Sequence, residues 1–392
     1  MVEQAVLDIR KRIEKAPISG GRGAKPERFN DLVFIPAQLA KRPVDYFKEK
    51  INAETVIGRL SKKPLKLSTP IMIAAMSFGA LNKYAKIAIA KASSEAGTAT
   101  NTGEGGMLPE ERESAKILIA QYSTGRFGVD EQYLKSADAI EVKIGQGAKP
   151  GQGGLLMGDK VTAEIAKIRK VEAGKTVHSP AYHPDIKNLD DLRAKIDWLK
   201  KITGGKPIIL KLGAGDIEND VELAVKSGAD VIAIDGYKGG TAAAPVVMLE
   251  DVGVPILSSI VKARTVMDKM KSKQELIVGG GLNTGSDFAK ALALGADAVF
   301  VASAILYAMG CTYCKLCYLG KCPVGLTTQD PKFMEKLDPN AKDKVVGYIN
   351  ACTEEIKMVA GAVGHNDVHK LCKNDLAALT KETAELCGIR FV

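Results

Sequence analysis

The chain has 392 residues, of which 46% are hydrophobic and 26% are charged, and its formal net charge is +9. This length allows one large domain or a barrel with extensions, and the composition is that of an ordinary globular protein. The lysines are scattered rather than gathered in a basic run, which argues against nucleic-acid binding. No apolar run could span a membrane and the amino-terminal segment does not resemble a signal peptide, so we expect a cytoplasmic protein.

The predicted elements begin with an extension over the first 65 residues, with helical periodicity at residues 2–15 and a glycine-rich loop at residues 20–23. From about residue 70, apolar stretches alternate with amphipathic ones. The predicted strands are residues 70–76, 97–101, 139–144, 207–212, 230–235, 254–258, 275–279 and 298–302. The predicted helices are residues 83–96, 160–171, 189–202, 217–227, 261–271 and 285–294, with a further helix from about Ser303.

This alternation predicts a parallel sheet with its helices outside. Eight strand–helix units are typical of a (β/α)8 TIM barrel. A doubly wound open sheet is the alternative, but the GxGxxG motif that would favour it is absent after the first strand. The sequence therefore predicts an α/β protein in three parts: an N-terminal extension over residues 1–65, a barrel over residues 66–310, and a C-terminal cysteine loop with helices over residues 311–392.

The cysteine loop contains four of the seven cysteines, at Cys311, Cys314, Cys317 and Cys322, and Pro323 follows the last. Thiolates this close together are typical of a metal ion or an iron–sulfur cluster. Zinc is the alternative, but zinc ribbons separate their two cysteine pairs by a long loop. The spacing therefore favours an iron–sulfur cluster and electron transfer. The other cysteines are isolated and are expected to be buried, inert thiols: Cys352, Cys372 and Cys387.

Two glycine clusters and a serine follow the late strands. Gly239, Gly240 and Thr241 follow the strand at residues 230–235, Gly280 and Gly281 follow the strand at residues 275–279, and Ser303 lies at a strand–helix junction. Glycines at these places let backbone N–H groups approach a phosphate, although they could also serve only to turn the chain. A phosphate site beside an iron–sulfur loop suggests flavin mononucleotide (FMN). Lys211, at the end of a strand, could stabilise a reduced anionic flavin or simply extend towards solvent.

A second constellation lies earlier in the chain. It consists of residues 101–106 with Glu104, residues 146–154 with Lys149, and Arg169. Glycine-rich loops that carry a carboxylate and an ammonium group can place an acid/base pair near a substrate. Lys149 and Arg169 could also bind a dicarboxylate. From spacing alone this hypothesis is weak, because loops rich in glycine and lysine are common.

Several segments resemble the FMN-binding synthase domain of the glutamate synthase family, in its stand-alone archaeal and bacterial form. The resemblance extends in order over residues 65–330. The matching segments are Met76-Ser77-Phe78-Gly79, Asn101 to Gly106, Ser123 to Gly128, Gln146 to Gly151, Gly239-Gly240-Thr241, Ala308 to Cys311, Cys317, Cys322 to Gly325, and Thr328-Gln329.

The resemblance implies a barrel with FMN at its mouth and an iron–sulfur cluster beside the flavin. The implied cofactor-binding residues are Met76, Ser77, Asn101, Gln146, Lys211, Gly239, Gly240, Thr241, Gly280, Gly281 and Ser303. The ligands of a three-iron 3Fe-4S cluster would be Cys311, Cys317 and Cys322, and Cys314 could complete a 4Fe-4S cluster. The family condenses 2-oxoglutarate with ammonia and reduces the 2-imino acid with FMN. Glu104 and Lys149 would be catalytic, with Lys149 and Arg169 binding the substrate.

The chain also departs from the family pattern. Leu155 stands where the family has a substrate-binding glutamine, so the substrate could be 2-oxoglutarate or a relative. His178 and His183 lie in the loop that covers the family pocket and could line the substrate, although we expect them to be partly exposed loop histidines. An N-methylglutamate synthase-like enzyme and a non-catalytic electron-relay subunit are alternatives to glutamate synthase. No amidotransferase domain or Rossmann fingerprint is recognisable, so the expected partners are a glutaminase subunit and a ferredoxin-like or NAD(P)H-reductase subunit, within an oligomer.

Overall fold

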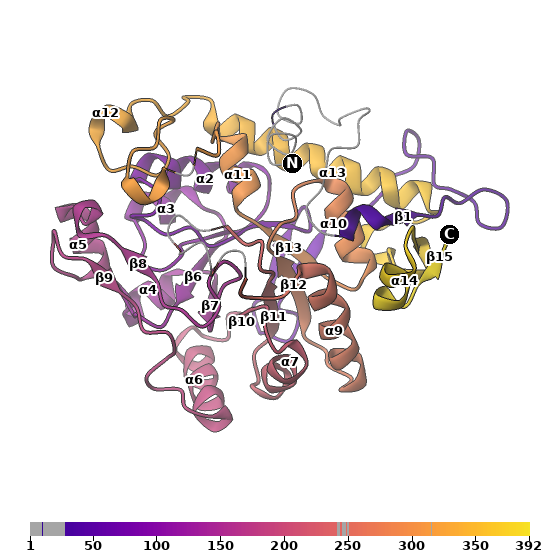
Figure 1. The fold of residues 1–392 in the computed structure, drawn as a ribbon, viewed down its shortest axis with the longest axis horizontal. Helices are drawn as coiled ribbons and strands as arrows, with labels where there is room; N and C mark the ends of the chain where they lie inside the picture. The colour runs from indigo at the N-terminus through magenta and orange to yellow at the C-terminus, as the bar shows by residue number, and fades with distance from the viewer. Residues whose placement is uncertain (1–9, 11–27, 241–243, 245–247, 249–250, 315) are drawn as a thin grey trace.

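Parallel strands form the centre of the protein (Figure 1), and there are eight in the described residues. The structure is a computed structural model that describes Arg10 and residues 28–240, 244, 248, 251–314 and 316–392. In chain order the strands are β4 (Ile71–Ile73), β5 (Thr100–Asn101), β6 (Leu118–Tyr122), β7 (Ala139–Lys143), β10 (Ile208–Gly213), β11 (Val231–Asp235), β12 (Glu275–Gly279) and β13 (Ala298–Val301). From β5 to β13 each strand pairs in parallel with the next, and β13 pairs with β4, so β4 and β5 are the two ends of the strand order. Because Ile73 N also donates to Ala99 O at 2.9 Å, the two ends of the strand order meet. The predicted (β/α)8 barrel is confirmed.

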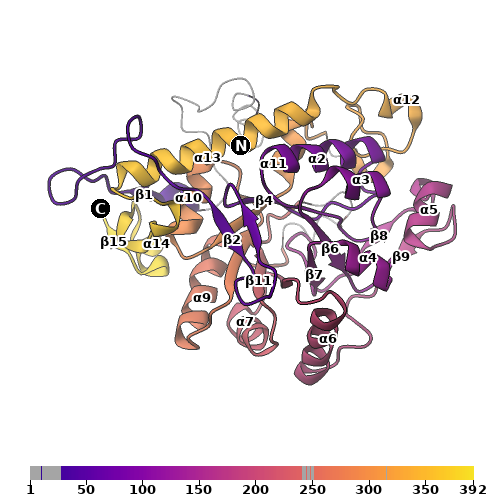
Figure 2. The ribbon, with the colours of Figure 1, turned by 180° about the vertical axis from the view of Figure 1, so that it is seen from behind.

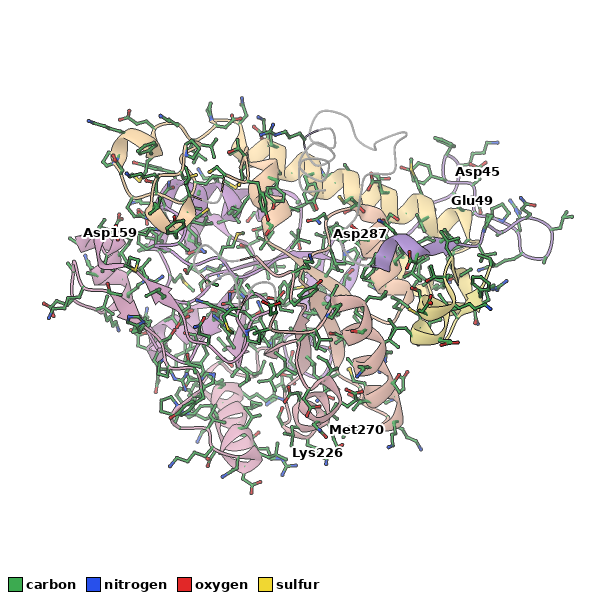
Figure 3. The ribbon with its side chains drawn as sticks, in the orientation of Figure 1. Asp45, Glu49, Asp159, Lys226, Met270 and Asp287 are labelled. Carbon is green, nitrogen blue, oxygen red and sulfur yellow. The ribbon has the colours of Figure 1, made fainter. Side chains whose placement is uncertain are left out.

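Helices surround the barrel and connect its strands (Figure 2). They are α2 (Lys83–Glu95), α3 (Pro109–Ser114), α4 (Glu131–Ser136), α5 (Ala163–Arg169), α6 (Leu189–Ile202), α7 (Ile217–Lys226), α9 (Ile256–Lys269), α10 (Gly285–Ala293) and α11 (Ser303–Ala308). Many begin at a polar residue whose side chain accepts a hydrogen bond from the first turn. Asn82 does so for α2 and Asn188 for α6. Asp287, labelled in Figure 3, completes a capping box with Thr284 at the start of α10.

The interior of the barrel is apolar except at its mouth, which is the opening at the carboxyl ends of the strands. Successive side chains of a strand point to opposite sides, so alternate residues face inwards. The inward cluster includes Met72, Ile119, Ile209, Val231, Ile277 and Ala298. The antiparallel hairpin of β2 (Thr55–Ile57) and β3 (Leu65–Leu67) adds its apolar side chains to this cluster. Gly58 N, in that hairpin, donates to Glu275 Oε2 at the start of β12. The hairpin thus closes the barrel at the amino ends of its strands, and the carboxyl ends remain for a site.

The carboxyl-terminal region packs against one side of the barrel. It contains α12 (Pro331–Met334), α13 (Ala341–Ala362), β14 (Leu376–Ala378), α14 (Lys381–Cys387) and β15 (Arg390–Phe391). The long helix α13 contacts α2, α10 and α11. Strand β1 (Leu32–Phe34), from the predicted extension, pairs antiparallel with β14. The predicted extension and the carboxyl-terminal region therefore share one small sheet. The division of the chain into three parts stays a prediction.

Two strand predictions differ from the structure. Residues 256–258, predicted as part of a strand, begin α9 instead. Pro255 immediately precedes this helix, and proline is well suited to a helix start because it needs no N–H partner there. Strand β6 was not predicted, since its five consecutive buried residues show no alternation of polar and apolar side chains. The predicted number of eight strands is right, although one of its members is wrong and one is missing.

Three smaller predictions have different outcomes. Cys352 and Cys387 are buried as expected, but Cys372 is exposed, because it lies at the start of the short turn η5 (Lys373–Asp375). The predicted helix at residues 2–15 and the loop at residues 20–23 lie outside the described residues, apart from Arg10. Within the described part of the chain, no helix combines the length and the apolar character that crossing a bilayer requires.

Candidate functional site

Charged and polar side chains replace the apolar interior at the mouth of the barrel. Glu141 on β7 is fully buried, and its Oε1 accepts a hydrogen bond from Gln121 Nε2 on β6 at 2.6 Å. The same oxygen lies 4.0 Å from Lys211 Nζ on β10, whereas Oε2 has no hydrogen-bond partner. Lys211 is itself buried in the barrel and not at its surface. Buried polar atoms without partners are rare in proteins and are consistent with a site for a polar ligand.

Glu104 and Lys143 form an ion pair in this mouth. Glu104 Oε2 lies 3.5 Å from Lys143 Nζ, and 12% and 14% of the two side chains are exposed. Burial alone would raise the pKa of Glu104, but Lys143, the Ser179 hydroxyl and Arg169 together lower it. Burial lowers the pKa of Lys143, and this effect outweighs the attraction of Glu104. A carboxylate that stays ionised beside an ammonium group that releases its proton easily is suited to acid/base chemistry.

Lys143 was not identified from the sequence. It lies in the predicted strand at residues 139–144, and its position two residues after Glu141 places both side chains on the inward face. The pairing of Lys143 with Lys211 across β7 and β10 brings two cations together near the same carboxylates. The alternation of inward and outward side chains along the predicted strand could have identified Lys143 as an inward-facing residue.

The loop at residues 146–154 folds over the mouth and approaches Glu104. Gly147 N donates to Asp235 Oδ2 at 2.9 Å, which anchors the residue next to Gln146 at the end of β11. At the other end of the loop, a side-chain carbon on Gly154 would lie 2.7 Å from Glu104 Oε2. Lys149 is buried between these points, and burial followed by the charge of Lys143 lowers its pKa. The Glu104 and Lys149 loops, predicted as parts of one constellation, therefore lie close together.

Arg169, the last residue of α5, is also brought to this region. Its Nη2 donates to Phe78 O at 2.7 Å and approaches Ser77 Oγ at 3.3 Å. A side-chain carbon on Gly105 would lie 2.5 Å from Arg169 Cζ, so the loop after β5 can pack on the guanidinium only with glycine there. Burial lowers the pKa of Arg169 to about 10. Arg169 thus ties the loops after β4 and β5 to α5.

The predicted cofactor residues Met76, Ser77 and Asn101 are neighbours. Asn101 Oδ1 accepts from Gly103 N at 2.9 Å, and Gly103 has a positive φ of 68°. A side-chain carbon on Gly103 would lie 2.5 Å from Ser77 N, so the two loops touch through their backbones. Asn101 Nδ2 is buried and has no hydrogen-bond partner. This amide therefore remains available as a donor at the mouth.

The two glycine clusters lie together at the ends of β11 and β12. Gly280 has a φ of 95°, and a side-chain carbon there would lie 2.5 Å from Gly236 O. A side-chain carbon on Gly240 would collide with Ser303 Oγ at the start of α11. Gly239 approaches the Asp235 carboxylate in the same way, and Gly281 also has a positive φ. Only glycine allows these backbones to approach so closely. Thr241 lies outside the described residues.

The cysteine loop follows α11. Cys322 is buried, Cys311 and Cys317 are partly buried, and Cys314 is exposed. Burial and then the neighbouring cysteines raise the pKa of Cys311 to about 11. Burial alone would raise the pKa of Cys322, but Thr327 and the backbone N–H groups of Leu326 and Val324 lower it. N–H groups directed at a sulfur favour its thiolate form.

The sulfur atoms of this loop do not form a compact three-ligand group among the described residues. Among the residues that the structure describes, the cysteine loop contains no three ligand atoms within 4.8 Å of one another. A single zinc ion would need them closer, since its bonds to sulfur are about 2.3 Å long. In a cluster, each thiolate binds a different iron, so wider spacing is expected. The choice of a cluster over zinc therefore stays a prediction from the cysteine spacing.

His183 corrects a prediction. It is buried rather than partly exposed, with Nε2 2.8 Å from Lys143 O and Nδ1 2.6 Å from Arg126. Burial, followed by the charge of Arg126, lowers its pKa to about 4, so the ring stays neutral. His183 also stacks on Tyr122, with ring centroids 6.0 Å apart. It supports the backbone of Lys143. His178 is exposed as expected.

Leu155 lies beside the mouth on β8 (Leu155–Leu156), which pairs with β9 (Val177–His178). Its side chain is 39% exposed, whereas that of Leu156 is buried in an apolar cluster with Phe78. The alternation along β8 therefore directs Leu155 away from that cluster. Leu155 is thus a large, exposed apolar side chain beside the charged side chains of the mouth.

Comparison with known proteins places this geometry in a family. Residues 24–366 match the family model described as the conserved region in glutamate synthase. The "Glutamate synthase large subunit-like protein" of Rhizobium meliloti (strain 1021) is 42% identical over 94% of this chain and 88% of its own length. The "Archaeal glutamate synthase [NADPH]" of Methanocaldococcus jannaschii is 40% identical over 95% of this chain and 80% of its own length.

Solved structures support the fold at lower identity. An (S)-mandelate dehydrogenase mutant covers 95% of this chain and 98% of its own, with a TM-score of 0.61 and 16% identity. A flavocytochrome b2 mutant with benzoylformate covers 90% and 77%, with a TM-score of 0.59 and 18% identity. These likenesses concern the fold alone. The family model and the relatives near 40% identity decide the family: the chain belongs to the glutamate synthase family.

Proposed function

We propose that this protein is the synthase subunit of an FMN- and iron–sulfur-dependent glutamate synthase, which converts 2-oxoglutarate and ammonia to L-glutamate. The observation that carries the proposal is the Glu104–Lys143 pair, 3.5 Å apart in the buried mouth of the barrel. Lys149 and Arg169 lie in the same region and can neutralise a dicarboxylate. The relatives named as glutamate synthases support this assignment.

FMN fits the residues at the mouth. We propose that the glycines at positions 239, 240, 280 and 281 and the Ser303 hydroxyl bind its phosphate, with Thr241 beside them. Met76, Ser77, Gln146, Lys211 and the unpartnered amide of Asn101 would surround its ring system. Bound FMN supplies hydride transfer, and an iron–sulfur cluster supplies single electrons. Cys311, Cys317 and Cys322 would hold that cluster, and Cys314 would be a ligand only in the 4Fe-4S form.

The ionic pair can perform the condensation that precedes reduction. When ammonia adds to the keto carbon, a C–N bond forms and the C=O π bond breaks, and Glu104 can accept the proton that the nitrogen loses and pass it to the alkoxide, which gives the carbinolamine. When the carbinolamine then loses water, Lys143 can donate a proton to the departing hydroxyl, the C–O bond breaks, and an iminium ion remains to be reduced. The lowered pKa of Lys143 makes it a better proton donor at neutral pH than an ordinary lysine. Lys149 would hold the keto acid by its carboxylate while these transfers occur, and we keep it as a second candidate for the proton donor.

Leu155 favours a second candidate, an N-methylglutamate synthase-like enzyme acting on an imine of an alkylamine. An apolar side chain at this position cannot hydrogen-bond a carboxylate, but it can contact an alkyl group. An electron-relay subunit without catalysis of its own is the remaining alternative. A glutaminase subunit and a ferredoxin-like or NAD(P)H-reductase subunit are the proposed partners, within an oligomeric cytoplasmic assembly.

One turnover experiment separates these possibilities. The protein would be purified without oxygen and supplied with 2-oxoglutarate, reduced viologen and either ammonium or methylamine. Glutamate from ammonium supports the first function, whereas N-methylglutamate formed preferentially from methylamine supports the second. If neither amino acid accumulates above a control reaction without the protein while the protein still accepts electrons, the relay role is left.

A further inference from the structure

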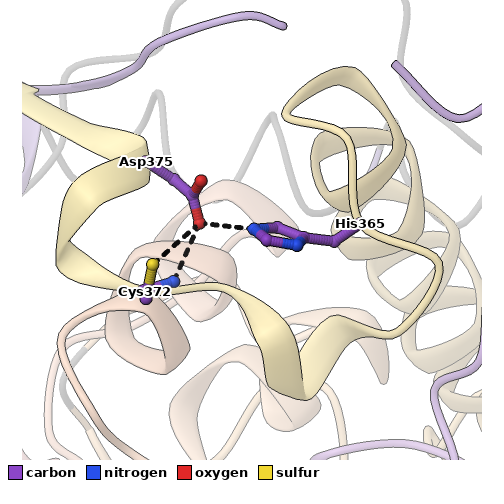
Figure 4. A group of neighbouring side chains, drawn as sticks. All are labelled: His365, Cys372 and Asp375. Carbon is purple, nitrogen blue, oxygen red and sulfur yellow. Dashed lines mark hydrogen bonds and ion pairs between the residues drawn. The ribbon is translucent and has the colours of Figure 1, made fainter. Parts of the chain in front are cut away.

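Three ligand-type side chains meet in the carboxyl-terminal region, outside the barrel mouth and the cysteine loop. His365 follows α13, while Cys372 and Asp375 lie at the two ends of the short turn η5. Figure 4 shows the three side chains directed towards one another. His365 Nε2 lies 2.8 Å from Asp375 Oδ2, and Cys372 Sγ lies 3.4 Å from the same oxygen. All three ligand atoms lie within 4.8 Å of one another.

This donor set is typical of zinc. An imidazole nitrogen, a thiolate and a carboxylate oxygen are the three kinds of protein ligand that zinc binds, with a fourth position open to water. Tetrahedral zinc with bonds of about 2.0–2.3 Å separates its ligand atoms by roughly 3.3–3.6 Å. The sulfur–oxygen distance of 3.4 Å already matches, and the nitrogen–oxygen distance of 2.8 Å must increase by a few tenths of an ångström.

A cation already stands beside these ligands. Lys41 Nζ lies 3.1 Å from His365 Nε2 and 3.5 Å from Asp375 Oδ1. His365 Nε2 is therefore within hydrogen-bond distance of an ammonium donor and a carboxylate acceptor at once, and one ring nitrogen can satisfy only one of them. The Lys41 side chain is 43% exposed, so it can move into solvent at little cost. A divalent cation would satisfy the nitrogen, the carboxylate and the thiol together.

A purely structural role accounts for only part of this arrangement. Asp375 Oδ2 accepts from Cys372 N at 2.9 Å and so caps η5. That bond explains the carboxylate, but it requires neither a thiol at position 372 nor an imidazole at position 365. The Cys372 sulfur also takes part in this capping box, but serine or threonine is the usual residue in that role.

We propose that His365, Cys372 and Asp375 form a binding site for a zinc-type divalent cation, which displaces the Lys41 ammonium group. Binding releases the thiol proton of Cys372 and uses the lone pair of His365 Nε2. The ion would join the segment after α13 to the turn before β14, the strand that pairs with β1. The site would therefore stabilise the carboxyl-terminal region, and it does not depend on the proposed enzymatic function.

The test measures zinc binding to the anaerobically purified holoenzyme after adventitious metal has been removed, with iron determined in parallel. We expect one zinc per chain, at least tenfold weaker binding in Cys372→Ser, and tighter binding in Lys41→Met. Lys48→Met is the matched control, because Lys48 is an exposed lysine paired with Asp45 in the same part of the chain, and it should leave the affinity unchanged. X-ray absorption at the zinc edge should show one sulfur neighbour at about 2.3 Å and otherwise lighter atoms.

Three results would overturn the proposal. Equal zinc binding by the wild type and Cys372→Ser would place the ion elsewhere. Several sulfur neighbours would place it in the cysteine loop. Absence of zinc from both the wild type and Lys41→Met would show that no such site forms. As an independent measurement, zinc should raise the thermal unfolding midpoint of the wild type but not that of Cys372→Ser.

Discussion

Lys86 and Glu111 form an ion pair beneath the mouth of the barrel, with Lys86 Nζ 2.7 Å from Glu111 Oε1. Only 3% and 1% of the two side chains are exposed. Lys86 Nζ also donates to Met76 O at 2.6 Å and to Thr102 O at 2.9 Å. One buried ammonium group thus joins α3 to the backbone that follows β4 and β5, where the proposed FMN contacts Met76, Ser77 and Asn101 lie.

Replacement of Lys86 by methionine should destabilise the protein strongly. Methionine fills a similar volume but leaves Glu111 without its ion-pair partner and three backbone carbonyls without this donor. Breaking a buried pair in this way costs about 3–5 kcal/mol in the free energy of unfolding. Urea denaturation of the apoprotein measures the change. The double variant Lys86→Met/Glu111→Gln should recover part of the loss, because it removes the isolated charge; a single variant as stable as the wild type would contradict the inferred role.

Glu104→Gln should lower kcat for glutamate formation by about 10²–10⁴-fold, the range typical of a lost general base. Glutamine preserves the size of the side chain but cannot accept the ammonia proton. Flavin content and the electron-acceptance rate should stay near wild type. Glu113→Gln is the control, since Glu113 is an exposed carboxylate in α3. Retained turnover in Glu104→Gln would move the base to another residue.

The pH profile of turnover should show an alkaline limb set by Lys143. As a proton donor, Lys143 is active only when protonated, so the rate falls as the pH rises through its pKa. Because burial lowers that pKa below the ordinary value of 10.5, the fall should begin at lower pH than an ordinary lysine would give. Lys143→Arg keeps the charge and should remove this limb from the accessible range. A limb that persists unchanged in Lys143→Arg belongs to another group, with Lys149→Arg the next variant to measure.

Gly280→Ala should weaken FMN binding by at least about tenfold, which corresponds to about 1.4 kcal/mol. The added carbon would lie 2.5 Å from Gly236 O, so the loop after β11 must move. Gly228→Ala is the matched control, since Gly228 has a comparable positive φ of 82° but no atom within 4 Å of the added carbon. Both variants carry the same kind of backbone strain, and only Gly280→Ala should lose flavin, as measured by titration of the apoprotein. Equal flavin affinity in the two variants would argue against the phosphate site.

Cys322→Ser should lose the cluster, whereas Cys314→Ser should retain iron. Cys322 is buried and its sulfur faces N–H groups that favour a thiolate, while Cys314 is exposed. Iron and sulfide analysis with electron paramagnetic resonance of the oxidised protein distinguishes a 3Fe-4S from a 4Fe-4S cluster. Loss of one iron on Cys314→Ser would instead identify Cys314 as a fourth ligand.

The order of elements was largely readable from the sequence, because strand and helix periodicities are local properties. The helix at residues 189–202 was predicted at its observed bounds, since it combines an amphipathic pattern with a capping asparagine at position 188. Residues 256–258 were misread because a short apolar run looks the same at the start of a buried helix as in a buried strand. β6 was missed for the related reason that a strand buried on both faces shows no alternation.

The cysteine spacing, the glycine clusters and the Glu104 and Lys149 loops were all identified from residue types alone. The tertiary structure decided which of these groups meet. Lys143 became a partner of Glu104 only when β7 was placed beside the loop after β5. His365, Cys372 and Asp375 converge because a turn after α13 reverses the chain, and Lys41 reaches His365 from 324 positions away in the sequence. Distances between residues far apart in the chain depend on packing, so no local pattern in the sequence could specify them.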